Sequence, residues 1–142
     1  MNRDELLGTW DLQRFWFTDD DSSEMDPLGD APVGNLILGA DGNYAFTMMR
    51  TGRCPYAGGD LLRGTADEKG EAADGYVSFG GTWTFGADAI TFRIAYSLFP
   101  NWVGGEQVRR TSIIGDELQL QTTGPILLAG KTHRGAARWL KL

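Results

Sequence analysis

The feature that most constrains the fold of this chain is a series of short alternating segments separated by glycine and aspartate. Asp41-Gly42 is the strongest hairpin signal among them, because Asp-Gly favours the two-residue turns whose twist matches that of paired strands. It separates residues 33–40 from residues 43–50, and Gly86-Ala87-Asp88 and Gly115-Asp116 divide two further pairs of segments. The pattern predicts an antiparallel sheet built mainly from hairpins.

Eight segments alternate with the period of a strand, and only one segment has a helical pattern. The strands are predicted at residues 10–17, 33–40, 43–50, 76–85, 89–98, 107–114, 117–123 and 136–142. A short helix is predicted at residues 66–74, because Thr65 and Glu68 have the spacing of a capping box and Gly75 follows. Without a second layer of helices, such a sheet exposes its edges unless it closes. We therefore expect an all-β, eight-stranded antiparallel barrel with one short helix, in one domain over residues 1–142.

Composition and charge exclude several classes of function. The net charge of −6 disfavours binding to nucleic acid and to anionic lipid surfaces. Cys54 is the only cysteine, so no internal disulfide can form, and we interpret it as an incidental thiol. No segment has the length of a signal peptide or a membrane span, and a cytoplasmic location is expected.

The chain offers little for metal or cofactor chemistry. His133 is the only histidine, which excludes a histidine-based triad and a multi-histidine metal site. It lies in the stretch 130–135, where we expect an exposed loop, with haem ligation as the open alternative. The acidic run at residues 19–26 lacks the pattern of a calcium loop and is interpreted as a solvated loop. We expect no metal and no cofactor.

Several segments resemble the bacterial and fungal lipocalin-like domain family. Gly8-Thr9-Trp10 is similar to the glycine-x-tryptophan strand that opens lipocalins, and the run 97–104, Ser-Leu-Phe-Pro-Asn-Trp-Val-Gly, followed by Gln107-x-Arg109 is the most specific match. Gly34-x-Leu36, Met48-Met49-Arg50, Gly59-Asp60 and Gly75-Tyr76 also match. The resemblance spans nearly the whole chain and implies a small barrel with an internal cavity. Some barrels of this kind serve in natural-product pathways as cofactor-free cyclases or isomerases. Family members often carry histidines in the strand before Pro-Asn-Trp, where this chain has Phe92 and Arg93.

The loop at residues 98–104 is a candidate rim for a pocket. Pro100 cannot donate to a ladder and Gly104 tolerates a positive φ, so the chain is expected to leave the sheet here. Asn101 and Trp102 are then held at the end of a strand, where binding residues often lie. The alternative is that Trp102 only caps an apolar core.

Strand alternation predicts which side chains face inward. Residues 10, 12, 14 and 16 share one face, which leaves Phe15 and Phe17 on the outer face; residues 90, 92, 94 and 96 share another inner face. Arg14 is expected to stack on a tryptophan at the closed end. Arg50 and Arg109 are either structural or contact a ligand, because an inward arginine requires a carboxylate or an anionic ligand.

These observations lead to the hypothesis that the barrel encloses a small hydrophobic organic molecule. The predicted ligand-binding residues are Trp16, Tyr44, Phe46, Met48, Arg50, Trp83, Phe92, Asn101 and Trp102. If the protein is an enzyme, a cofactor-free cyclase or isomerase fits better than a hydrolase, with Tyr96 and Arg109 as catalytic residues. The alternatives are a non-catalytic carrier of a ligand and a homodimeric structural module that associates through Phe15 and Phe17.

Overall fold

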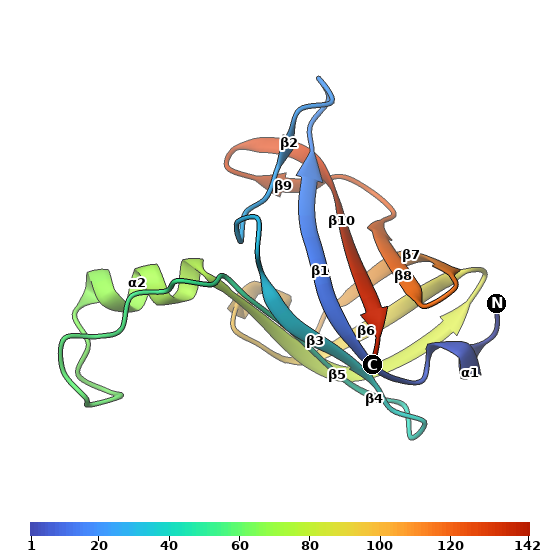
Figure 1. The fold of residues 1–142 in the computed structure, drawn as a ribbon, viewed down its shortest axis with the longest axis horizontal. Coiled ribbons are helices and arrows are strands. Elements are labelled where there is room, and N and C mark those ends of the chain that lie inside the picture. The colour runs from blue at the N-terminus through green and yellow to red at the C-terminus, as the bar shows by residue number, and fades with distance from the viewer.

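Eight long strands wind into a closed antiparallel barrel in the computed structural model, which describes residues 1–142 (Figure 1). The strands are β1 (Gly8–Thr18), β3 (Val33–Leu38), β4 (Asn43–Met49), β5 (Tyr76–Gly86), β6 (Ala89–Ser97), β7 (Glu106–Ile114), β8 (Glu117–Thr122) and β10 (Lys131–Lys141). Each pairs with the next in this order, and β10 pairs with β1 to close the sheet. The predicted barrel is therefore confirmed.

Shorter elements decorate the two ends and one side of the barrel. The strands β2 (Glu24–Met25) and β9 (Ile126–Leu128) extend hairpins with β1 and β10. The helix α2 (Ala66–Asp74) has the predicted bounds and capping box, and it projects from the side of the barrel (Figure 1). Two helical segments were not predicted, namely α1 (Arg3–Leu6) and the 3-10 helix η1 (Pro100–Trp102). Asn2 and Glu5 form a capping box on α1, a signal that the sequence carried.

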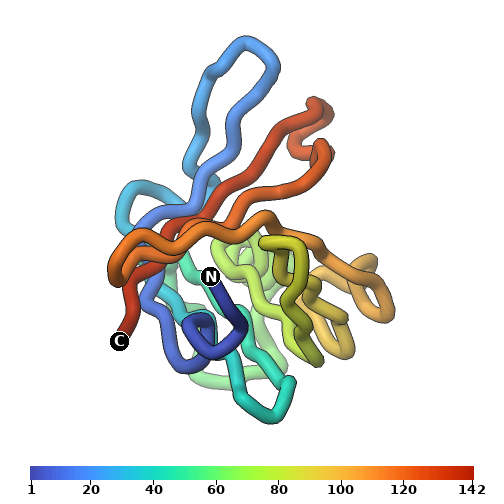
Figure 2. Tube along the Cα trace, turned by 90° about the vertical axis from the view of Figure 1, so that its right-hand side faces the viewer, coloured from blue at the N-terminus to red at the C-terminus, as the bar shows by residue number.

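Both termini lie at one end of the barrel, and α1 lies at the same end (Figures 1 and 2). Leu6 of α1 lies across this end with no exposed surface, and the Trp10 indole donates a hydrogen bond of 2.9 Å to its carbonyl oxygen. The Lys141 ammonium lies 4.6 Å from the centre of the Trp10 ring. The Arg3 guanidinium lies at the same distance from the Trp83 ring. The expected stacking of a cation on tryptophan at the closed end thus involves Arg3 and Lys141, and the prediction that Arg14 lies there is wrong.

Aromatic side chains fill the half of the barrel next to this closed end. Phe92 and Trp139 have no exposed surface, and the Phe46 ring meets both edge to face at 5.8 and 5.2 Å. The Tyr44 hydroxyl donates a hydrogen bond of 3.1 Å to the Arg93 carbonyl oxygen, and burial raises the pKa of Tyr44. Full burial of one such aromatic side chain contributes about 2–3 kcal/mol. This half is a packed core.

A β-bulge in β1 reverses the alternation of that strand before it reaches the other end. Leu12 pairs with Trp139 and Arg14 pairs with Arg138, so Gln13 is an extra residue on β1. One extra residue moves every following side chain to the opposite face. Phe15 and Phe17 therefore face the interior, and Arg14 and Trp16 face outward. The predicted faces of these residues are wrong.

A second bulge has the same effect in β6. Gly80 pairs with Tyr96 and Gly81 pairs with Ile94, which leaves Ala95 as the extra residue. Ile90, Phe92 and Ile94 are buried as predicted, whereas Tyr96 is 58% exposed. The prediction that Tyr96 shares their face is wrong, and Ser97 takes the inward position instead.

Candidate functional site

The barrel is hollow at the end opposite the termini. A cavity of about 620 Å³ opens there between the ends of β1, β4, β6 and β8 and the start of β5. Its size lies within the range of pockets that bind small organic molecules. Because 19 of its 27 lining residues are hydrophobic, the cavity favours an apolar occupant over water.

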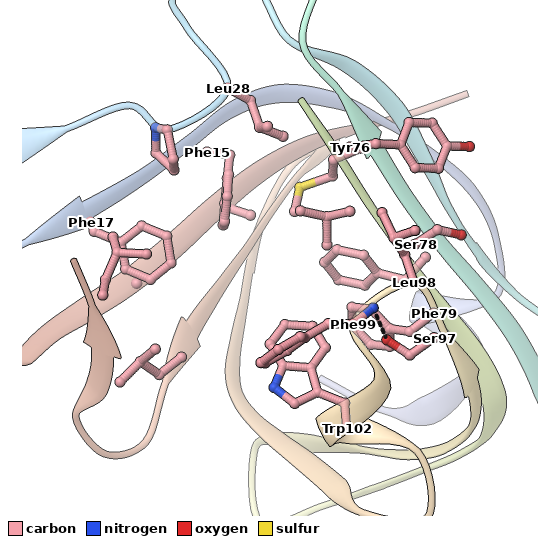
Figure 3. A pocket seen from close by; sticks show the side chains of 18 of the residues that line it. Phe15, Phe17, Leu28, Tyr76, Ser78, Phe79, Ser97, Leu98, Phe99 and Trp102 are labelled. Atoms are coloured by element: carbon pink, nitrogen blue, oxygen red, sulfur yellow. Dashed lines mark hydrogen bonds between the residues drawn. The ribbon is translucent and has the colours of Figure 1, made fainter. Parts of the chain in front are cut away.

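Aromatic rings form two facing walls of the cavity (Figure 3). Phe15 and Phe17 lie on one side, with ring centres 5.1 Å apart and edge to face. Phe79 and Trp102 lie on the other side at 5.4 Å, and Phe99 packs against Trp102 at the rim. The space between these walls suits a flat ring, because aromatic groups favour edge-to-face and offset-stacked contacts.

The position of Phe17 depends on a glycine and a histidine of β10. A Cβ atom on Gly135 would lie 2.7 Å from the Phe17 ring, so only glycine allows this close approach. The His133 ring meets Phe17 edge to face at 6.3 Å, and its Nδ1 lies 3.0 Å from the Lys131 carbonyl oxygen. His133 is 7% exposed and lies within β10, so the predicted exposed loop is wrong. It lies behind Phe17 and does not line the cavity.

Arg109 is the charged residue of the inner wall. Its Nη2 donates to the Gln107 side-chain oxygen at 2.9 Å and its Nη1 donates to the Val108 carbonyl oxygen at 3.1 Å. It belongs to none of the ion pairs of the structure. Burial lowers the pKa of Arg109 to about 10, so the side chain is still a cation at neutral pH. Thr122, its partner across the β7–β8 ladder, lines the same wall.

The predicted site residues fall into three places. Phe46, Met48, Trp102 and Arg109 line the cavity. Tyr44, Trp83 and Phe92 are buried in the filled half, where the Trp83 indole donates to the Gly39 carbonyl oxygen at 3.0 Å. The remaining four, Trp16, Arg50, Tyr96 and Asn101, do not line the cavity.

Trp16 belongs to a charged cluster on the outside of the barrel. The Arg14 guanidinium lies 4.4 Å from the Trp16 ring centre and forms ion pairs with Asp26 at 3.0 Å and Glu24 at 3.2 Å. The hydrogen bond that Arg14 donates to Asp26 raises the pKa of Arg14. Part of the acidic run at residues 19–26 is thus ion-paired, whereas the sequence predicted a solvated loop.

The other three residues also have local structural contacts. Arg50 is exposed and donates to the Pro27 carbonyl oxygen, and Asn101 is exposed in η1. The Tyr96 ring lies over Gly80, where any Cβ atom would overlap it. The basis for the homodimer is also lost, because Phe15 and Phe17 line the cavity.

Many lining residues were missed from the sequence. They include Phe15, Phe17, Leu28, Val77, Phe79, Ser97, Thr122 and residues 126–129. Leu98, Phe99 and Pro100 of the predicted rim loop do line the cavity. One signal was available, because paired glycines such as Gly80-Gly81 inside a strand pattern are typical of a bulge. No comparable signal marks the bulge at Gln13.

Comparison with known proteins identifies the family. A model of the lipocalin-like domain matches residues 7–142. The 4'-hydroxy-3'-methoxypropiophenone carrier protein ppsC of Aspergillus oryzae (strain ATCC 42149 / RIB 40) is 32% identical over 103 residues, covering 67% of this chain and 93% of that protein. A lipocalin-like protein of Bacteroides uniformis ATCC 8492, known from a crystal structure, is 13% identical with a TM-score of 0.48, covering 97% of this chain and 99% of that one. No helix of the chain has both the length and the apolar character needed to cross a membrane. The extent of the family match shows that this chain belongs to the lipocalin-like domain family.

Proposed function

We propose that this protein binds and carries a small, largely apolar molecule with at least one aromatic ring. The observation that carries the proposal is the cavity of about 620 Å³ between two aromatic walls. A drug-sized ligand in such a pocket buries most of its surface, and removal of that surface from water favours binding by about 25 cal/mol per Å² before the costs of association.

The similar protein of Aspergillus oryzae supports the class of ligand and the role of carrier. Its name gives an aryl ketone with a hydroxyl and a methoxy group on the ring. A ring of that kind fits between Phe79 and Trp102 on one side and Phe15 and Phe17 on the other. The oxygen substituents would meet the few polar groups of the lining, above all Arg109.

The proposed binding residues differ in part from those expected from the sequence. They are Phe15, Phe17, Phe46, Met48, Phe79, Trp102 and Arg109. Tyr44, Trp83 and Phe92 are proposed to support the floor of the cavity instead of touching the ligand.

Cyclase or isomerase activity has less support and stays a prediction. Arg109 could stabilise negative charge that develops on a substrate. However, Tyr96, the predicted catalytic partner of Arg109, lies on the outside of the barrel, and the single histidine, His133, does not line the cavity. The cytoplasmic location and the homodimer also stay predictions.

Isothermal titration against small aromatic ketones, phenols and acids tests the proposal, with 4'-hydroxy-3'-methoxypropiophenone included. We expect at least one compound to bind with one-to-one stoichiometry. Phe79→Ala and Trp102→Ala should weaken this binding by about tenfold, since each removes about 1.4 kcal/mol of aromatic contact. Trp16→Ala is the matched control and should bind like the wild type. Absence of binding across the panel, or equal losses in the control, would contradict the proposal.

A further inference from the structure

No carboxylate of the protein forms an ion pair with the Arg109 guanidinium. A guanidinium held among apolar side chains loses hydration, and this loss is normally offset by a carboxylate. Here the cavity wall around Arg109 is mostly hydrophobic and Arg109 forms no ion pair. Asp74 is the only other charged residue of the lining, and it lies exposed on α2.

The neighbour that positions Arg109 is neutral. Gln107 lies two residues earlier on the same face of β7 and accepts a hydrogen bond of 2.9 Å from Nη2. A glutamate in this position would orient the guanidinium equally well and would also neutralise it. The glutamine fixes the orientation and leaves the positive charge available.

Arg109 also has hydrogen-bonding capacity left for a ligand. A guanidinium has five N–H donors, and the protein accepts from two of its nitrogens, through Gln107 and the Val108 carbonyl. Thr122, directly across the ladder, accepts from the Gly135 amide at 3.1 Å, so its own hydroxyl proton can point elsewhere. Together these groups offer several donors and one full positive charge on one wall.

From this arrangement we propose that the ligand of the cavity carries an anionic oxygen, a carboxylate or a phenolate, which pairs with Arg109. The inference rests on the proposed function and narrows its class of ligand from apolar aromatic molecules to aromatic anions. The ring lies between the aromatic walls, and the anionic oxygen meets the guanidinium with charge-assisted hydrogen bonds. Burial of the pair away from water strengthens the attraction.

Two matched pairs of probes separate charge from shape. Biphenyl-4-carboxylate and biphenyl-4-carboxamide have nearly the same size, and only the first is an anion at neutral pH. 4-Hydroxyacetophenone and its methyl ether test the phenolate, whose formation on binding is seen directly as a red shift of its absorption. We expect the ionisable member of at least one pair to bind about tenfold more tightly, which is about 1.4 kcal/mol.

Three variants assign that preference to the guanidinium. Arg109→Met should remove the preference, so that the charged and the neutral member of each pair bind with similar affinity. Gln107→Glu should also remove most of the preference for the anion, because the new carboxylate forms an ion pair with the Arg109 guanidinium. Arg110→Met, which removes the exposed neighbouring charge on the same strand, should change nothing. Near-ultraviolet circular dichroism checks that each variant is folded, and the comparison between Gln107→Glu and Arg110→Met stands even if Arg109→Met does not fold.

The possible outcomes distinguish this inference from the proposed function. Neutral probes that bind as tightly as their anions, or a preference that survives in both Arg109→Met and Gln107→Glu, would overturn the anion assignment and leave the carrier function in place. If neither these probes nor the earlier panel binds, both proposals fail.

Discussion

The two halves of the barrel are built from the same strands and differ in how their interior is packed. In the closed half, α1 covers the end of the barrel. Large side chains there, such as Phe92 and Trp139, have no exposed surface. In the open half, the same strands continue around a cavity of about 620 Å³. We infer that the filled half supplies most of the stability of the fold and that the hollow half holds the proposed binding site.

The two bulges produce much of this difference. Without them, β1 and β6 would place Arg14, Trp16 and Tyr96 inside the open half. The extra residues Gln13 and Ala95 turn these side chains outward and bring Phe15, Phe17 and Ser97 to the cavity. A large and partly charged lining is thereby replaced by two aromatic rings and a small hydroxyl.

The largest predicted effect is the difference in stability between a Phe→Ala substitution in the closed half and one in the open half. Phe92→Ala should lower the free energy of unfolding by about 3–5 kcal/mol, because it opens a void in a packed core. Phe17→Ala should cost about 1–2 kcal/mol, because Phe17 already borders a cavity, and it should weaken ligand binding. Chemical denaturation measures both. Equal losses in the two variants would remove the distinction between a filled and a hollow half.

The second-largest predicted effect on stability concerns the β-bulge at Ala95 of β6, which turns Tyr96 outward and Ser97 inward. A Cβ atom on Gly81 would overlap the Arg93 carbonyl oxygen, so Gly81→Ala should cost about 2–3 kcal/mol and disturb the cavity wall. Gly86→Ala, at the exposed far end of β5, meets no atom within 4 Å and should be nearly neutral. Unfolding curves and ligand titrations of the two variants check this, and a tolerated Gly81→Ala would show that the bulge does not need glycine.

Arg109 should destabilise the open half in the absence of ligand. Its pKa of about 10 lies below that of an unfolded arginine, which corresponds to about 3 kcal/mol of cost for the charged form. Arg109→Met removes this cost and loses two hydrogen bonds, so we expect it to be more stable than the wild type by about 1–2 kcal/mol.

The pH dependence of this difference has a fixed sign. The cost of the cation is fully present below about pH 10 and is lost as the pH rises from there, because the folded arginine releases its proton first. The advantage of Arg109→Met should therefore be constant from pH 7 to about 9 and shrink above pH 10. A variant less stable than the wild type at neutral pH would indicate a structural role for the guanidinium.

The smallest effect compares two tyrosines. Tyr44→Phe should cost about 1 kcal/mol, because it leaves the Arg93 carbonyl oxygen without its donor. Tyr96→Phe should change neither stability nor binding, since the Tyr96 side chain is mostly exposed. A loss of binding in Tyr96→Phe alone would return this residue to the site.

The sequence predicted the fold better than the site, for a physical reason. Hairpin turns such as Asp41-Gly42 and the capping box of Thr65 and Glu68 are local signals, and the barrel and α2 follow from them. The inward faces depend on register along the whole strand, and a single extra residue inverts them. Phe46 and Met48 lie on a strand without a bulge and line the cavity as predicted, whereas Trp16 and Tyr96 lie beyond a bulge. Alternation alone left open whether Arg109 or Arg110 faces inward, and the structure places Arg109 there.

The five tryptophans of the chain allow the most direct test of the division into a filled and a hollow half. Trp10, Trp83 and Trp139 are buried in the closed half, Trp102 lines the cavity and Trp16 lies outside. We would label the protein with 5-fluorotryptophan, assign the five fluorine resonances by single Trp→Phe variants, and titrate biphenyl-4-carboxylate. This division predicts that the Trp102 resonance shifts most and that those of Trp16 and of the closed half stay nearly unchanged. A ligand that shifts Trp16 or the closed-half resonances and leaves Trp102 in place would contradict it.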